Sequence, residues 1–172
     1  RDDEIGHFAL EMLSLTQRWR TRQEEVEHQA FHDPLTGLPN RTFMRTKIEE
    51  WVEIFSAKNM KFAIMVIRVD GMSQTNQLLG HLNGDIFLFQ VAGILNNILG
   101  NKQRHTEPVV GRTQGDEFTI LLPIDSIAEA NVVGKYIKEA VTTEFNIDKI
   151  NVKVRASVAG LVYPDHGLDI TE

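Results

Sequence analysis

The chain has 172 residues, and its 24 acidic against 18 basic side chains give a formal net charge of −6 at pH 7. It has no cysteine, which excludes disulfide frameworks and thiolate metal sites, so any metal must use oxygen or histidine ligands. The acidic balance argues against a general nucleic-acid binder, and the apolar runs are shorter than the ~20 residues that span a bilayer. We therefore expect this segment to be soluble.

The first thirty residues have the pattern of a coiled-coil helix. Apolar or long side chains recur three and four residues apart at positions 5, 8, 12, 15, 19, 22, 26 and 29. This seam predicts a parallel homodimer. The alternative is a single amphipathic helix that lies on the core of its own domain. The charged segment from Arg18 to Glu27 favours the dimer, because little else there is apolar.

Helix-breaking residues follow this seam and divide the chain into two units. They are Pro34, Gly37 and Pro39. We predict a signalling helix over residues 1–30 and a folded domain over residues 31–172.

The domain is predicted to alternate helices and strands. Asn40 can cap a helix over about 41–55, and Ser126 can cap another to about Thr143. Residues 84–99 are apolar almost all round, which indicates a helix buried on more than one side. Strands are predicted at 62–69, 109–112, 118–122 and 152–162. This order predicts an α+β fold with an antiparallel sheet flanked by helices.

The turn between the two middle strands carries two adjacent carboxylates. Asp116 and Glu117 follow Gly115, which has no side chain, so the tip of the hairpin can hold a cation and admit a phosphate. An isolated Gly-Asp-Glu is also typical of an ordinary polar hairpin turn. Its meaning therefore depends on the rest of the sequence.

Several further segments resemble the motifs of GGDEF domains, in the order and at nearly the spacing of that family. Residues 33–41 resemble D-x-L-T-G-L-x-N-R, residues 80–85 resemble G-H-x-x-G-D, and residues 112–118 resemble R-x-G-G-D-E-F. Residues 157–160 and 163–167 resemble the later strand and loop of members that are fused to an EAL phosphodiesterase domain.

The resemblance implies a fold like that of nucleotidyl cyclases and polymerase palms. Active members condense two GTP molecules to cyclic di-GMP between two facing protomers, with Mg²⁺ as cofactor. It implies that Asp116 and Glu117 are catalytic, that Asp116 binds metal, and that Asn76, Asp85 and Gly115 bind the guanine nucleotide. By their own pattern alone, the residues favour structural roles, a helix cap for Asn76 and a first-turn charge for Asp85.

Three positions depart from the family pattern. Two lie in the segment that matches D-x-D-x-F-K, and one lies at the first glycine of the hairpin. Arg68 replaces the metal-binding aspartate, Ser73 replaces the phosphate-binding lysine, and Gln114 replaces the glycine. We expect Gln114 to crowd the nucleotide and strain the turn. We also expect Arg68 to pair with Asp116 or Glu117 in place of a metal.

Asp70 is a weak substitute for the lost metal ligand. It lies on the same strand face as Arg68, but two residues displace it by about 6.6 Å. We expect the site to be catalytically impaired.

Residues 3–6, Asp-Glu-Ile-Gly, resemble the D-E-x-G that opens the second helix of a HAMP relay, although a plain signalling helix is the alternative. HAMP relays usually follow a transmembrane helix. The resemblance thus implies a membrane receptor with this part at the cytoplasmic face of the inner membrane, attached only through an upstream segment. The family's A-D-x-A-M-Y-x-A-K helix is expected beyond Glu172.

The sequence supports one leading function and two alternatives. The leading hypothesis is a regulatory GTP-binding or relay module in a homodimer, which acts on a downstream EAL domain in the same chain. The first alternative is an active diguanylate cyclase. The second is a structural dimerisation spacer, which GTP binding would distinguish from the leading hypothesis.

Overall fold

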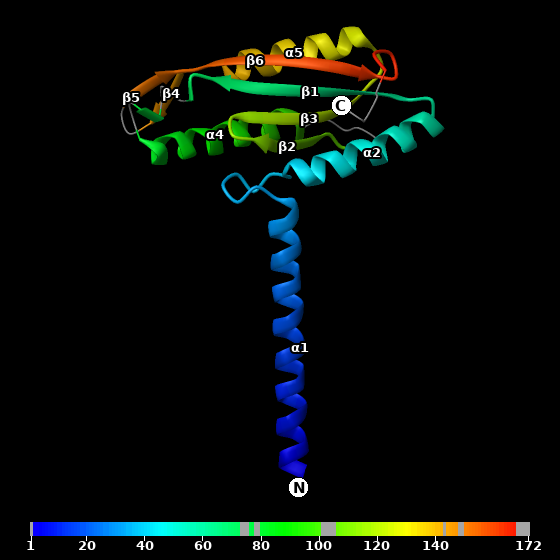
Figure 1. Cartoon of the computed structure of the whole chain (residues 1–172), viewed down its shortest axis with the longest axis vertical. Helices are drawn as coiled ribbons and strands as arrows, with labels where there is room; N and C mark the ends of the chain where they lie inside the picture. The colour runs from blue at the N-terminus through cyan, green and yellow to red at the C-terminus, as the bar shows by residue number, and fades with distance from the viewer. Residues whose placement is uncertain are drawn as a thin grey trace.

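A computed structural model describes residues 2–72, 76–77, 80–100, 106–142, 144–147 and 150–167. Helix α1 (Asp2–Phe31), here called the stalk, projects from a globular head formed by the rest of the chain (Figure 1). The head contains α2 (Arg41–Ala57), β1 (Lys61–Asp70), α4 (His81–Gly100), β2 (Val109–Gln114), β3 (Glu117–Ile124), α5 (Ile127–Val141), β4 (Glu144–Ile147), β5 (Ile150–Lys153) and β6 (Arg155–Tyr163).

Four strands form an antiparallel sheet in the order β2-β3-β1-β6. The central strand β1 pairs with β3 on one side and with β6 on the other. Helices cover both faces, so the predicted α+β fold with a helix-flanked antiparallel sheet is confirmed.

Strand β1 shows how the side chains divide between two cores. Ala63, Met65, Ile67 and Val69 point into a large core under α4 and α5. On the opposite face, Phe62 and Ile64 pack in a second core with α2 residues, among them Trp51 and Phe55. Helix α2 covers only that end of the face, because Val66, Arg68 and Asp70 are exposed there. The second half of β1 therefore presents an uncovered strip of sheet.

The two predicted helix caps are confirmed. The Asn40 side chain accepts a hydrogen bond of 3.1 Å from the Phe43 amide, and the Ser126 hydroxyl accepts one of 3.2 Å from the Glu129 amide. Each cap satisfies a backbone N–H that the first helical turn leaves without a partner.

The single strand predicted over 152–162 is wrong. Two strands lie there, because β5 pairs with β4 in a separate two-stranded sheet while β6 pairs with β1. Val154 separates them and is buried in the large core. Strand β4 was not predicted. Residue alternation predicts an extended backbone, but it does not identify the strand with which that backbone pairs.

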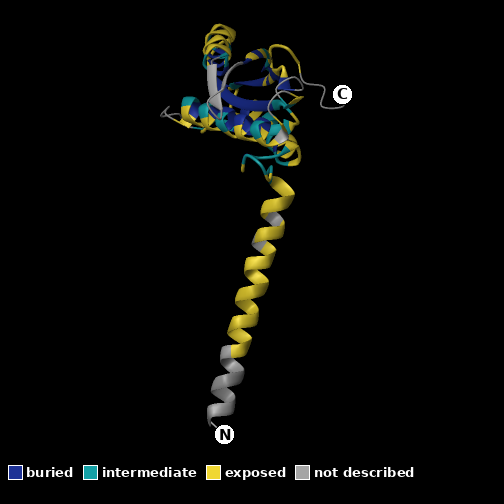
Figure 2. Cartoon of the chain, turned by 90° about the vertical axis from the view of Figure 1, so that its left-hand side faces the viewer, coloured by how far each residue is buried: buried dark blue, intermediate teal, exposed yellow. Residues whose placement is uncertain are grey.

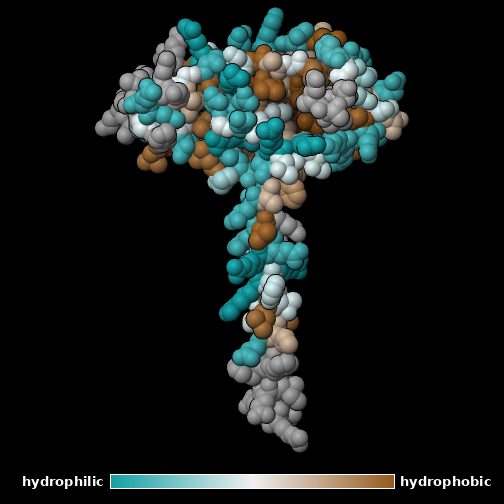
Figure 3. Space-filling model, in the orientation of Figure 1, coloured by the Kyte–Doolittle hydropathy of each residue, from teal (hydrophilic) through white to brown (hydrophobic). Residues whose placement is uncertain are grey.

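The expectation that residues 84–99 are buried on more than one side is also wrong. Helix α4 buries one face, which includes Phe87, Val91 and Leu95, in the large core. On its outer face Leu82 is 75% exposed and Phe89 is 60% exposed. Figure 3 shows apolar residues gathered at the lower edge of the head, where α4 lies.

By length and composition alone, Leu82–Gly100 could span a membrane, with a mean hydropathy of 1.2. The expectation that every apolar run is too short for this is therefore corrected. The packed inner face of α4 is that of a core helix.

The stalk makes contact with the head only at its C-terminal end, and its described residues are exposed (Figures 1 and 2). Trp19, in the predicted seam, is 74% exposed, and Val26 is 60% exposed. The alternative in which this helix lies on its own domain is therefore wrong. Asn40 joins the stalk to the head, since its backbone N–H donates to the Phe31 carbonyl and its side-chain amide donates to the Ala30 carbonyl, both at 2.8 Å.

Candidate functional site

The uncovered strip of β1 lies beside the carboxylates of the hairpin between β2 and β3. In the antiparallel register, Arg68 lies directly opposite Glu117. The Arg68 guanidinium contacts one oxygen of the Glu117 carboxylate, with distances of 3.1 Å from Nη2 and 3.2 Å from Nε. The predicted pairing of Arg68 with a hairpin carboxylate is thus confirmed, with Glu117 as the partner.

The turn of the hairpin is tied to the end of β1. Gly115 has φ of 45°, a left-handed conformation that suits a residue without a side chain. The backbone N–H of Val69 donates to the Asp116 carbonyl at 3.0 Å. Gln114 is exposed and is not in the left-handed region. The strain expected at Gln114 is therefore not found, because the turn places its positive φ at Gly115.

Asp70 lies on the same face of β1 as Arg68, but its side chain is directed toward β6. Its carboxylate accepts a hydrogen bond of 2.9 Å from the Ser157 hydroxyl of β6. Because β1 separates β6 from β3 in the sheet, this contact directs Asp70 away from the hairpin. Ser73, the other departure near this strand, lies outside the described residues.

The two residues implied to read guanine lie before α4 and in its first turns. The Asn76 side-chain oxygen is buried and has no hydrogen-bond partner among the described residues. It lies against Gly84, where an added Cβ would collide with it. Asp85 is the next residue and is exposed in the first turn of α4. The fold therefore places the Asn76 side chain beside the residue that precedes Asp85.

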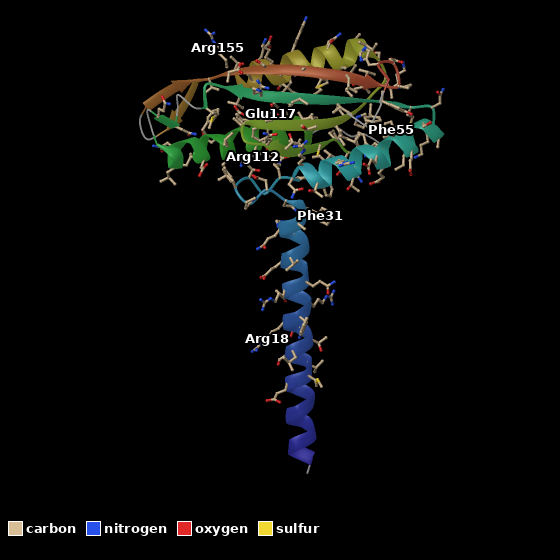
Figure 4. All side chains as sticks on the ribbon, in the orientation of Figure 1. Arg18, Phe31, Phe55, Arg112, Glu117 and Arg155 are labelled. Atoms are coloured by element: carbon tan, nitrogen blue, oxygen red, sulfur yellow. The ribbon has the colours of Figure 1, made fainter. Side chains whose placement is uncertain are left out.

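Sequence reasoning missed an ion pair that joins the turn after the stalk to the hairpin. Arg112, which is labelled in Figure 4, donates from Nη1 to Asp33 at 2.9 Å and from Nε to the Gly115 carbonyl at 2.9 Å. Asp33 also accepts hydrogen bonds from the Thr36 amide and hydroxyl at 2.8 and 2.7 Å. The motifs at residues 33–41 and 112–118 were both recognised in the sequence. No local pattern, however, links two residues so far apart in the chain.

The electrostatics of this ion pair favour the charged carboxylate. Partial burial acts to raise the pKa of Asp33, but the hydrogen bonds from Thr36 and Arg112 and the positive charge of Arg112 outweigh it. The pKa of Asp33 is therefore lowered from its ordinary value. Beside the pair, a polar cleft of about 380 Å³ lies between the end of the stalk and the hairpin, and its lining includes Gln29, His32 and Gln114.

Within the described part of the chain, no three carboxylate or histidine side chains gather into a metal-binding group. The hairpin presents Asp116 and Glu117, and Glu117 is engaged by Arg68. The arrangement offers an ion pair, an exposed strip of sheet and a buried amide oxygen.

Comparisons with known proteins agree with this architecture. The family model described as "Diguanylate cyclase, GGDEF domain" matches residues 30–172. The bifunctional diguanylate cyclase/cyclic di-GMP phosphodiesterase MucR of Pseudomonas aeruginosa is 28% identical over 143 residues, covering 83% of this chain and 20% of that protein. The chain thus spans about a fifth of the length of the first curated relatives that it matches.

Solved structures extend the comparison to three dimensions. The GGDEF domain of TpbB from Pseudomonas aeruginosa superposes with a TM-score of 0.72 at 29% identity, covering 79% of this chain and 77% of that chain. The coiled coil and GGDEF domain of DgcB from Caulobacter crescentus has the same fold, with a TM-score of 0.80 at 17% identity, covering 94% of this chain and 84% of that chain. Since the family model covers residues 30–172, the chain belongs to the diguanylate cyclase GGDEF-domain family.

Proposed function

We propose that this chain is a degenerate GGDEF domain of a cyclic di-GMP signalling protein, which binds guanine nucleotide or relays a signal without synthesising cyclic di-GMP. The ion pair between Arg68 and Glu117 carries this proposal. At position 68 the family pattern has a carboxylate that holds a divalent cation. Here the position has a cation of its own, which neutralises one of the two hairpin carboxylates.

The residues present do not fit Mg²⁺. This ion requires oxygen ligands in near-octahedral geometry. Arg68 offers only N–H donors, and a guanidinium group is a cation. A like charge about 4 Å from a bound cation is unfavourable by several kcal/mol at an intermediate dielectric. Asp116 alone remains as a candidate ligand, because Asp70 is directed to Ser157.

The other half of the site supports a guanine ligand. A carboxylate such as that of Asp85 can accept the N1–H and N2–H of guanine together, which adenine cannot reproduce. The buried Asn76 oxygen lacks a donor among the described residues, and leaving such an atom unpaired costs free energy. With Gly115 at the open turn, these residues form our proposed GTP site.

The wider context is also part of the proposal. The exposed seam of the stalk supports a parallel homodimer, in which residues 1–30 form the signalling helix and residues 31–172 the GGDEF domain. MucR is named both as a diguanylate cyclase and as a cyclic di-GMP phosphodiesterase. This pairing supports a downstream EAL phosphodiesterase domain in the protein that contains this chain. A HAMP relay at residues 3–6 would attach the domain to a membrane through an upstream segment and keep it at the cytoplasmic face. The side chains of residues 3–6 lie outside the structural description.

The test of activity uses the full-length protein with GTP and Mg²⁺. We expect no cyclic di-GMP from the unmodified protein. The triple variant Arg68→Asp, Ser73→Lys and Gln114→Gly should restore measurable synthesis, because it returns the metal ligand, the phosphate cation and the open turn together. Each single variant should restore little, since residues that act as a unit are non-additive.

Two other outcomes would contradict the proposal. Robust synthesis by the unmodified protein that Asp116→Ala abolishes would show an active cyclase. The hairpin keeps Gly115, Asp116 and Glu117, so this is the second candidate function. The second outcome is that calorimetry detects no binding of GTP, and that Asp85→Ala gives the same titration as the unmodified protein. The domain would then be a dimerisation spacer instead.

A further inference from the structure

The last two turns of the stalk carry a pair of histidines on one face. His28 and His32 are four residues apart, so their side chains lie one above the other on the helix. Their rings are stacked with centroids 4.1 Å apart and an angle of 7° between the ring planes. Two imidazoles at this helical spacing are a recurrent metal-binding arrangement.

The hydrogen bonding of His32 prepares it to act as a ligand. Its Nδ1 lies 3.2 Å from the His28 carbonyl oxygen. Because a carbonyl only accepts, Nδ1 must carry the proton, and in the neutral ring Nε2 then carries a free lone pair. Metal-binding histidines almost always make such a contact through their second nitrogen. Phe43 lies near the His32 ring, with centroids 6.2 Å apart, and His32 is half-buried.

A carboxylate occupies the same helix face one turn earlier. Glu25 precedes His28 by three residues and His32 by seven, which places it within about 60° of both around the helix axis. Its side chain is exposed. No third ligand stands beside the two imidazoles within the described conformation. To bind one ion, the stacked rings would turn so that their Nε2 atoms converge, and Glu25 would join them by changing rotamer. Two histidines and one glutamate are a common ligand set for zinc.

We propose that His28 and His32, completed by Glu25, bind a divalent transition-metal ion such as Zn²⁺ at the C-terminal end of the stalk. The chain has no cysteine, and nitrogen and carboxylate donors suit Zn²⁺ and Cu²⁺ better than Mg²⁺. A bound ion would tie together the last two turns of α1, directly before Asp33 and the turn that contacts the hairpin. The three proposed ligands include none of the residues Asn76, Asp85 and Gly115 of the proposed GTP site.

Calorimetric titration of the chain with Zn²⁺ tests the proposal. We expect one ion per chain at saturation. Either His28→Ala or His32→Ala should weaken binding by at least about tenfold, and Glu25→Gln should weaken it less, because the two imidazoles are already placed together. Electron paramagnetic resonance of the Cu²⁺ form should show coupling to two nitrogens in the unmodified chain and to fewer in either histidine variant.

A matched control keeps the composition and changes only the spacing. Exchanging residues 27 and 28, by Glu27→His with His28→Glu, separates the histidines by five positions and by about 140° around the helix. This variant should lose binding as His28→Ala does, with unchanged helix content by circular dichroism. His166→Ala should leave binding unchanged, because His166 lies in the head and its Nδ1 accepts from the Val162 amide. Failure to bind Zn²⁺, or equal binding by the exchanged variant, would overturn the proposal.

Discussion

Asp33 shows how one side chain can join the stalk turn to the hairpin. It receives two hydrogen bonds from Thr36 and one from Arg112, and both members of the ion pair are largely buried, with 18% and 12% of their side chains exposed. Hydrogen bonds to a charged group contribute about 1.5–3 kcal/mol each at best, and less where solvent reaches them. We therefore expect Asp33→Asn to lower the free energy of unfolding at pH 7 by about 1–3 kcal/mol.

The pH dependence of this loss follows from the lowered pKa of Asp33. A carboxyl whose pKa is lower in the folded state contributes stability that is fully present above its unfolded pKa and is lost as the pH falls through its folded pKa. The difference between the two proteins should therefore shrink from pH 5 downward and vanish in strong acid. Urea unfolding across this range measures it. Glu49→Gln, which removes an exposed pair with Arg45, is the control and should cost at most about 0.5 kcal/mol. A loss that persists at the lowest pH would contradict the assignment.

Some contacts between single residues could be predicted from the sequence, and others could not. The contact of Arg68 with the hairpin was predictable, because this sequence has a cation where the family pattern has a metal-binding carboxylate, and strand pairing brings that position opposite Glu117. The contact between Asp33 and Arg112 was not, because neither residue charge nor periodicity selects a partner 79 residues away. The guanine roles of Asn76 and Asp85 remain predictions.

At the scale of elements, strand β2 lies close to the segment that joins α1 to α2 at Gly111. The Arg112 amide donates to the Pro39 carbonyl at 2.8 Å. A Cβ added at Gly111 would lie 2.8 Å from that carbonyl oxygen and would collide with the Met44 side chain. We expect Gly111→Ala to lower the free energy of unfolding by about 1–3 kcal/mol, because backbone cannot move aside as a side-chain tip can.

Gly93 provides the matched control for this substitution. It lies on the exposed face of α4, and an added Cβ would meet nothing within 4 Å. Gly93→Ala should therefore raise the free energy of unfolding by about 0.5–1 kcal/mol, since alanine is the better helix former. Chemical denaturation of both variants should show changes of opposite sign in the free energy of unfolding. An equal effect of the two substitutions would contradict the close approach at Gly111.

The elements were predictable where local chemistry determines them. The caps at Asn40 and Ser126 and the hairpin strands follow from side chains within a few residues. The small β4-β5 sheet and the exposed face of α4 were not predictable, because each depends on which other elements lie nearby. Composition shows that α4 is apolar, but it does not show how many neighbours cover it.

At the scale of the whole molecule, the exposed seam of the stalk predicts assembly. We expect light scattering to show a dimer whose dissociation rises on dilution. Leu15→Glu should weaken the dimer by at least about tenfold, because it places a charge in the apolar seam. Leu13→Glu is the control, since Leu13 is 66% exposed but lies outside the seam. A strict monomer at high concentration, or equal effects of the two variants, would contradict the dimer.

The ion pair across β1 and β3 has a consequence for the evolutionary history of this domain. Arg68 and Glu117 lie opposite each other in the sheet, and like charges in that relation destabilise a strand pair. A mutation of Arg68 to aspartate would therefore place two carboxylates opposite each other and weaken this strand pair unless a cation bound between them. Under the proposed function, a gain of catalysis through this position would begin with a loss of stability, so selection would favour keeping the arginine. Descendants of this chain are expected to retain it and to diversify in the residues around it.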